Sequence, residues 1–235
     1  MKKKLWITGF IFLLMLALVY GIYQWMNARS FQVFGHLTDQ VETNEKVVAL
    51  TFDDGPTEHV GDLLGLLQQY EAKSTFFLIG KDMEDNMEKA QEIVEAGHQV
   101  GNHTYSHEKM VFKSYAFYKK ELNRTNELIR ESGYEGKIDF RPPYGKKLFG
   151  LPYYLKQKNM DTITWDLEPD TFYSTVEDKV TYVNENVKKG SIILLHPMYG
   201  ERKKALATVE GILKSLTEKG YSFVTVDELQ RYEEE

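Results

Sequence analysis

The sequence predicts an α/β protein with a parallel sheet, preceded by an N-terminal transmembrane helix. Seven short apolar segments of strand length alternate with six longer amphipathic segments of helical period, which is typical of βαβ units. Several helical segments end on glycine, the residue that commonly follows the last turn of a helix. An open doubly wound sheet and a closed barrel both fit this alternation, and both place chemistry at the carboxyl ends of the strands.

The N-terminal segment has the charge and length of a membrane anchor. Three lysines at 2–4 precede an uncharged run of 21 residues, Leu5 to Trp25. At about 1.5 Å per residue this run would span about 31 Å as a helix, enough to cross a bilayer core. Positive charge before the span predicts an inner N-terminus and an extracellular domain. Residues 23–28 match a signal-peptide cleavage site poorly, so we favour an uncleaved single-pass anchor in the cell membrane, with cleaved secretion as the alternative.

The remaining chain shows no internal repeat and no low-complexity linker. We therefore expect a Lys cluster and signal-anchor over 1–28, a juxtamembrane segment over 29–44 and one domain over 45–235. Strands rich in β-branched and aromatic residues are expected at 47–52, 74–79, 98–101, 138–141, 161–165, 191–195 and 221–226. Amphipathic helices are expected at 59–72, 86–97, 114–133, 151–159, 175–190 and 202–220.

Composition excludes several classes of protein. The net charge is −6, and no basic block lies outside the first four residues, which argues against nucleic acid as a partner. The chain has no cysteine, which excludes disulfides and thiolate metal sites. Hydrophobic content of 42% is ordinary for a globular protein with a buried core.

Polar side chains follow five of the predicted strands. Asp53 and Asp54 end the first strand within "VVALTFDDGP", where a turn alone would explain them. However, three of the six histidines also lie at strand ends, whereas His36, His59 and His98 are interpreted as ordinary surface or strand-edge residues. Five polar clusters at the carboxyl ends of strands, which lie on the same side of a parallel sheet, favour a functional site. The other clusters are His103 with His107, Arg141, the "WDLEPD" segment, and His196.

The histidine spacing suggests a metal. His103 and His107 are four residues apart, so two imidazoles could reach one ion, and one neighbouring carboxylate would complete a two-His, one-acid set. The second carboxylate could then remove a proton from the attacking water, and His196 could protonate a leaving group. This set of groups indicates metal-assisted hydrolysis of an acyl bond.

Together these motifs resemble the polysaccharide deacetylases of the NodB-homology type, carbohydrate esterase family 4. "TFDDGP", "STFFLIG", "HTYSH", "RPPYG" and "LLH" occur in the family's order over nearly the whole soluble chain. The resemblance implies a distorted (β/α)7 barrel of the TIM type, with fewer than eight strands, following the transmembrane helix.

The resemblance also implies the roles at the metal and the attacking water. Asp54, His103 and His107 would hold the metal. Asp53 would be the general base, and Arg141 would orient it and keep it ionised.

Further roles concern the acetyl and leaving groups. The backbone N–H of Tyr144 would receive the oxyanion, Leu195 would line the pocket for the acetyl methyl group, and His196 would protonate the departing amine. Zn²⁺ is the favoured ion, with Co²⁺, Mn²⁺ and Ni²⁺ as alternatives.

One motif departs from the family pattern. The family places Asp-Trp after the fifth strand, but this chain reads "WDLEPDTF". Asp170 is the chosen partner of His196, with Asp166 and Glu168 as rivals. Trp165 and Phe172 are the aromatic candidates for substrate contacts.

The favoured function is removal of N-acetyl groups from N-acetylglucosamine units of peptidoglycan, with the membrane as second partner. A β-1,6-linked or chitin-like N-acetylglucosamine polymer is the second choice of substrate, and O-acetyl xylan is the third. A glycoside hydrolase is disfavoured because adjacent carboxylates do not flank a bond from about 5 Å or more apart. A catalytically silent glycan-binding barrel is disfavoured because no expected ligand or base is missing.

Overall fold

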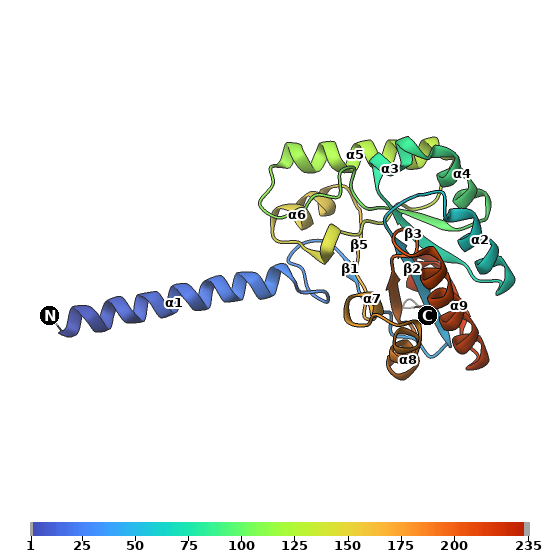
Figure 1. Cartoon of the computed structure of the whole chain (residues 1–235). Coiled ribbons are helices and arrows are strands. Elements are labelled where there is room, and N and C mark those ends of the chain that lie inside the picture. Colours follow the sequence, from blue (N-terminus) through green and yellow to red (C-terminus); the bar gives the residue numbers. More distant parts are fainter. Residues whose placement is uncertain (1, 233–235) are drawn as a thin grey trace.

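In the computed structural model, which describes residues 2–232, a long N-terminal helix leads into an α/β domain (Figure 1). This helix, α1 (Lys2–Met26), projects away from the domain. Its stretch Trp6–Met26 has a mean hydropathy of 2.1, and none of its most apolar window is buried. By length and composition α1 is therefore able to cross a membrane.

The centre of the domain is a parallel sheet around strand β2 (Val47–Asp53). β2 pairs with β3 (Ser74–Leu78) on one side and β6 (Ile192–Leu195) on the other, and β4 (Gln99–Asn102) extends the sheet beyond β3. All seven residues of β2 are buried, as expected of a central strand covered on both faces. A short strand, β7 (Ser222–Phe223), pairs with the start of β2.

A second, smaller sheet closes the structure into a distorted barrel. β1 (Leu37–Thr38) pairs in parallel with β5 (Thr162–Ile163). Single-residue bridges join Phe140 to both Asn102 and Thr162, and Leu167 to Ile193. These bridges link β4 through β5 to β6, so the predicted α/β barrel is confirmed.

Helices cover the outside of the barrel (Figure 1). Three of them begin after a residue of a type that favours helix N-caps: Ser114, Thr175 and Thr225 each accept a hydrogen bond from a first-turn N–H. The helices are α2 (Val60–Gln69), α3 (Gly80–Asp85), α4 (Met87–Glu95), α5 (Tyr115–Glu131), α6 (Gly150–Gln157), α7 (Pro169–Phe172), α8 (Val176–Asn186), α9 (Arg202–Glu218), α10 (Val226–Arg231) and the 3-10 turn η1 (Pro143–Gly145).

Three expected strands are much shorter than predicted: the one expected at 161–165 spans only Thr162–Ile163, and the other two are shortened for local reasons. The strand expected at 138–141 is reduced to a bridge at Phe140, because Pro142 and Pro143 follow directly and cannot donate to a ladder. The strand expected at 221–226 ends at Phe223, because Thr225 and Glu228 form the capping box of α10.

The segment 29–44 is part of the barrel rather than a free connection. Its residues Leu37 and Thr38 form β1, and Val41 is fully buried in the core. A two-residue strand has no measurable sequence period, which explains why the sequence did not predict it.

Candidate active site

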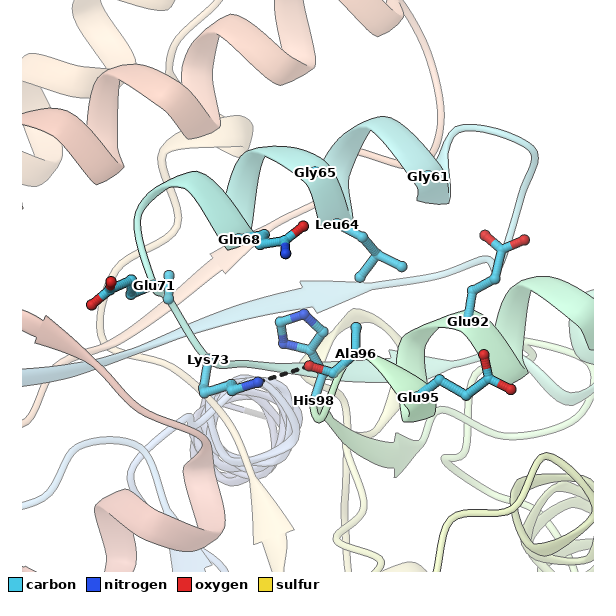
Figure 2. A pocket seen from close by; sticks show the side chains of 11 residues that line it. Gly61, Leu64, Gly65, Gln68, Glu71, Lys73, Glu92, Glu95, Ala96 and His98 are labelled. Atoms are coloured by element: carbon cyan, nitrogen blue, oxygen red, sulfur yellow. Dashed lines mark hydrogen bonds between the residues drawn. The ribbon is translucent and has the colours of Figure 1, made fainter.

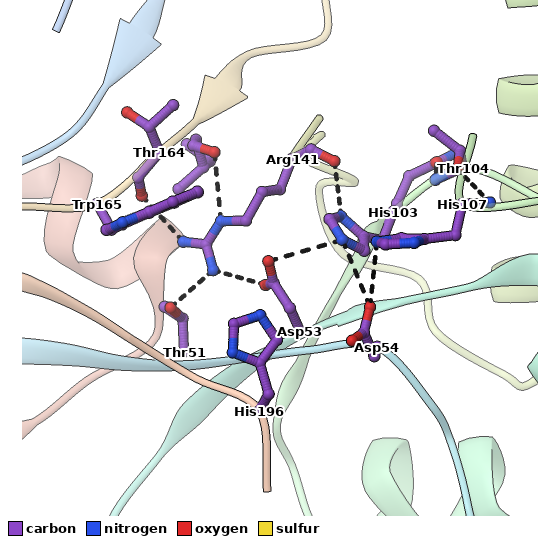
Figure 3. Close-up of polar contacts among 12 residues, drawn as sticks. Thr51, Asp53, Asp54, His103, Thr104, His107, Arg141, Thr164, Trp165 and His196 are labelled. Carbon is purple, nitrogen blue, oxygen red and sulfur yellow. Dashed lines mark hydrogen bonds and ion pairs between the residues drawn. The ribbon is translucent and has the colours of Figure 1, made fainter. Parts of the chain in front are cut away.

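The two adjacent carboxylates at the end of β2 share His103 but otherwise differ in partner, Asp53 contacting Arg141 and Asp54 contacting His107 (Figure 3). Asp53 is the last residue of β2 and is 3% exposed. Asp54 follows with a left-handed backbone, φ 72°, an uncommon conformation for a residue other than glycine. This change of backbone direction lets one carboxylate enter the barrel while the next faces the histidines that follow β4.

Asp54, His103 and His107 offer three ligand atoms within 4.8 Å of one another. The Asp54 Oδ1 atom lies 3.4 Å from His107 Nε2 and 3.7 Å from His103 Nε2. It is buried and has no hydrogen-bond partner among the described residues, which is costly unless a cation occupies the space. The donor set and the unpaired buried oxygen both fit a divalent cation.

The tautomer of the neutral His103 ring follows from the hydrogen-bond partner of its Nδ1 atom. His103 Nδ1 lies 2.8 Å from the carbonyl oxygen of Arg141. A carbonyl can only accept a hydrogen bond, so Nδ1 carries the proton and donates it. In the neutral ring this tautomer leaves the Nε2 lone pair free, and Nε2 faces the Asp carboxylates, as required of a histidine that binds a metal.

Asp53 is held by a fully buried arginine. Arg141 Nη1 donates to Asp53 Oδ1 at 2.7 Å and to Thr51 Oγ1 at 2.8 Å. Its remaining donors are directed to the carbonyls of Ile163 and Thr164. Burial by itself would raise the pKa of Asp53, but the charges of Arg141 and His103 outweigh it and hold this pKa below its usual value. Asp53 is therefore ionised at neutral pH.

His196, at the end of β6, is paired with Asp170 of α7. The backbone N–H of His196 donates to Asp170 Oδ2 at 2.8 Å, and its Nδ1 lies 3.4 Å from the same oxygen. Burial opposes the charged imidazole, but the Asp170 carboxylate raises the pKa of His196 to about 9. Burial likewise opposes the charged Asp170, yet hydrogen bonds from His196 and Lys179 lower its pKa to about 2.

The rival acids of the fifth-strand segment have other partners. Asp166 accepts from Ser191 Oγ and the backbone N–H of Ile192. Glu168 accepts from Trp165 Nε1 at 3.0 Å and from Arg29 at 2.8 Å. Of the three acids considered, Asp170 is the one that contacts His196.

The other predicted substrate contacts differ in exposure. Leu195 is 2% exposed and lines a cavity of about 200 Å³ together with His196 and Asp170. Tyr144 has a left-handed backbone, φ 61°, and its ring lies 4.9 Å from that of His107. Phe172, 62% exposed, is available to a ligand. The roles of all three stay predictions.

Trp165 is not placed on the substrate groove as expected. It is 4% exposed and lies under the guanidinium of Arg141, with its ring centroid 5.5 Å from Arg141 Cζ. Trp165 belongs to a buried apolar cluster, so its ring packs against Arg141 and does not face the surface.

Sequence reasoning missed three residues that hold the site. Thr51 and Thr164 both accept from Arg141, and Lys179 donates to Asp170 at 2.6 Å. The alternation within β2 could have indicated Thr51, which lies two residues before Asp53 and therefore on the same face. Lys179 lies in α8, and no local pattern connects it with Asp170.

Comparisons with known proteins place the chain in a family. The profile described as polysaccharide deacetylase matches residues 40–163. The chain belongs to the polysaccharide deacetylase family. It is 34% identical over 213 residues to a peptidoglycan-N-acetylglucosamine deacetylase of Bacillus cereus, covering 87% of this chain and 97% of that protein. It is 35% identical over 198 residues to the peptidoglycan-N-acetylmuramic acid deacetylase PdaC of Bacillus subtilis, covering 82% of this chain and 40% of that longer protein.

Solved structures of the same family share the fold. The Bc1960 peptidoglycan N-acetylglucosamine deacetylase superimposes with a TM-score of 0.77 and 30% identity, covering 83% of this chain and 92% of that one. BA3943 of Bacillus anthracis, described as a pseudoenzyme of carbohydrate esterase family 4, gives 0.75 and 26%, covering 84% and 69%. Members of this fold therefore include both deacetylases and an inactive protein, so the fold alone does not determine activity.

Proposed function

We propose that this polysaccharide deacetylase removes N-acetyl groups from N-acetylglucosamine units of peptidoglycan. The observation that carries the proposal is the unpaired, buried Asp54 Oδ1 beside two histidines, next to an ionised Asp53 held by Arg141. Relatives named as peptidoglycan deacetylases support the choice of polymer. A silent barrel is disfavoured because the expected metal ligands and base are all present and close together.

The residues would divide the chemistry among them. Asp54, His103 and His107 would hold a divalent cation, with Zn²⁺ favoured because two imidazoles and one carboxylate suit it. When bound, the cation supplies Lewis acidity that polarises the acetyl carbonyl and makes water easier to deprotonate.

Asp53 takes the proton from the attacking water. It is ionised because Arg141 compensates its burial, and it cannot rotate freely because Arg141 donates to one oxygen from a fixed position. A base that is charged and already positioned accepts the proton without reorganisation.

His196 and Tyr144 act on the nitrogen and the oxygen of the acetyl amide as its C–N bond breaks. With a pKa raised to about 9, His196 carries a proton at neutral pH that it can give to the departing amine. Asp170 holds the imidazole by the contact to Nδ1, which leaves Nε2 to face the substrate. The backbone N–H of Tyr144 would donate to the oxyanion, an assignment supported by its constrained turn in η1.

Helix α1 would anchor the enzyme in the cell membrane with the domain outside. The support is its apolar stretch of 21 residues, the absence of buried residues from its most apolar window and the lysines that precede it. The division into an anchor at 1–28, a juxtamembrane segment at 29–44 that contributes β1 to the barrel, and a deacetylase domain at 45–235 is part of this proposal.

The test is metal-dependent acetate release by the full chain in detergent. The protein is stripped with a chelator, reloaded with Zn²⁺, Co²⁺, Mn²⁺ or Ni²⁺, and assayed on peptidoglycan, N-acetylglucosamine oligomers and O-acetyl xylan. We expect release from peptidoglycan that requires the ion. Release from O-acetyl xylan alone would replace the amide substrate by an ester, and a bound ion with no release from any polymer would indicate a binding role.

A further inference from the structure

Of the ten exposed large apolar side chains outside α1 in the described chain, six lie on one side of the domain, and the other four lie in the segments that follow the strands: Tyr144, Phe172, Tyr173 and Tyr199. Outside α1, none of those in the described chain comes from α2, α4, α8, α9 or α10. Six of them lie on the segment after α1, the loop before α5, the start of α5 and the region of α6. We call these six the aromatic face: Phe31, Val33, Phe112, Tyr115, Phe149 and Tyr153, which are 41–79% exposed.

The aromatic face is continuous with the end of α1. The Trp25 ring lies 4.2 Å from Phe149 and 6.3 Å from Phe31 between ring centroids. Further along α6, Tyr153 packs on Phe34 at 5.5 Å. The hydroxyl of Tyr115 donates to Gln157 at the end of α6, which brings the start of α5 to the same surface.

Figure 1 shows α6 and the loop before α5 on the side of the domain from which α1 projects. A bilayer crossed by α1 would therefore meet this side of the domain first. The opposite side, formed by α2, α4 and α9, contributes no exposed large apolar side chain among the described residues.

The charge of this side differs from that of the whole protein. Residues 140–160, which include α6, contain no Asp or Glu, although the protein carries a net charge of −6. Arg141 and Lys147 of this segment are buried, but Lys146, Lys156 and Lys158 are accessible. Lys156 is exposed, with its Cβ near Gly35, and Lys109 lies over the Tyr144 ring. Aromatic side chains with lysines around them match the interface of a bilayer that contains anionic phospholipids.

The orientation of α1 relative to the domain is fixed by a buried lysine. The backbone N–H of Lys147 donates to the carbonyl of Met26 at 3.2 Å, and its Nζ donates to the carbonyl of Ala28. Lys147 is 2% exposed, so these carbonyls at the end of α1 are bound inside the domain. Arg29 continues the connection through its ion pair with Glu168 at 2.8 Å. The domain therefore cannot turn freely on its anchor.

We propose that the aromatic face lies on the surface of an anionic phospholipid bilayer, around the point where α1 enters it. This inference rests on the proposed role of α1 as the anchor. Tyr144, 57% exposed, contacts Lys109 on one side and His107 on the other, so the catalytic site borders the face. Glycan would then reach the site along the membrane surface.

The absence of cysteine from the sequence permits a direct test with single-cysteine variants of the full chain in nanodiscs. A fluorophore is attached to Phe112→Cys or Tyr153→Cys on the aromatic face, to Leu13→Cys in α1, or to Gln69→Cys at the exposed end of α2. The nanodiscs contain phosphatidylglycerol and phosphatidylcholine, with a nitroxide quencher on the headgroup or deep in the acyl chain.

We expect the headgroup quencher to quench the probes at 112 and 153, the deep quencher to quench the probe at 13, and neither to quench the probe at 69. Quenching at 13 with probes at 112 and 153 as bright as that at 69 would overturn the proposal while leaving the anchor intact. No quenching at 13 would remove the anchor on which it rests. Acetate release, measured separately, reports on the proposed catalytic function independently of both results.

A second arm tests the charge. In the Tyr153→Cys background, the double substitution Lys109→Glu, Lys156→Glu should reduce quenching by the headgroup nitroxide. The control Lys214→Glu, at an exposed position of α9, should not reduce it. Raising ionic strength from 0.1 to 1 M shortens the Debye length from about 10 to about 3 Å and should reduce quenching in the same way. The assignment of an anionic lipid surface would be overturned if Lys214→Glu reduced quenching as much as Lys109→Glu with Lys156→Glu. It would also be overturned if discs of phosphatidylcholine alone gave the same quenching as discs that contain phosphatidylglycerol.

Discussion

The two ends of the barrel differ in how they satisfy their polar groups. At the carboxyl end of the strands, Arg141 and Asp53 form a fully buried ion pair whose partners come from distant parts of the chain. At the amino end, a groove of about 790 Å³ lies between α2 and α4 (Figure 2). There Lys73 donates to the nearby carbonyl of Ala96, and His98 accepts from the backbone N–H of Ser74.

Backbone strain shows the same difference. Asp54, Thr104, His107 and Tyr144 all have φ between 55° and 72°, and all lie around the candidate site. A non-glycine residue in this region costs free energy that the surrounding packing must offset. The larger groove at the amino end has one such residue, Glu71 with φ 51°, and no buried ion pair among the described residues that line it, so cavity size alone would have indicated a different site.

The largest effect is expected at the carboxyl end, where Asp53→Asn should abolish most of the turnover. Asparagine has the same shape and can still accept from Arg141, but it cannot take a proton from water. We expect turnover to fall by about 10³-fold, within the range for general bases, with metal content unchanged. Acetate release and elemental analysis of the purified variant measure the two quantities. Turnover close to wild type would remove Asp53 from the role of base.

Arg141→Met tests whether the ion pair holds the carboxyl end together. Methionine fills part of the volume but leaves Asp53 buried without its partner, which should lower the free energy of unfolding by about 3–5 kcal/mol. Denaturant unfolding of the full chain in detergent gives this value. The double variant Asp53→Asn, Arg141→Met should be more stable than Arg141→Met alone, because no unpaired charge remains. A double variant of lower stability would contradict this account.

The sequence predicted the residues of the site better than the contacts among them. The positions of Asp53, His103, Arg141 and His196 at strand ends follow from alternation of apolar strands and polar termini, which is local information. Lys179 and the burial of Trp165 depend on which loop packs on which helix, and no spacing in the sequence encodes that. The same holds for the fold: β2, with seven buried residues, was predicted almost to its ends. The two-residue strand β1 was not predicted, and the strands expected at 161–165 and 221–226 are only two residues long.

At the amino end, His98 should make stability depend on pH. Burial, followed by the nearby charge of Lys73, lowers the pKa of His98 to about 4. Between its unfolded pKa of about 6.5 and the folded value, only the unfolded chain binds the proton. Stability should therefore fall as pH decreases through this window, by up to about 3 kcal/mol in total.

The matched variant is His98→Asn, which keeps an acceptor for the Ser74 N–H but does not titrate in this range. The difference in unfolding free energy between wild type and variant should shrink from pH 7 to pH 4.5, with acetate release at pH 7 unchanged. Parallel stability curves would show that His98 is protonated in the folded protein.

The smallest effect on stability is expected from Gly65→Ala, and it should be opposite in sign to the effect of Gly101→Ala. Gly65 lies in α2, and a Cβ atom there meets nothing within 4 Å, so alanine should stabilise the helix by about 0.5–1 kcal/mol. At Gly101 in β4 a Cβ would lie 2.5 Å from the Phe77 ring, which stacks under Arg141 at 4.1 Å. Gly101→Ala should therefore lower both the melting temperature and acetate release, since displacing Phe77 moves the arginine that positions Asp53. A neutral Gly101→Ala would mean that the packing beneath Arg141 is loose, and that the ion pair alone fixes the base.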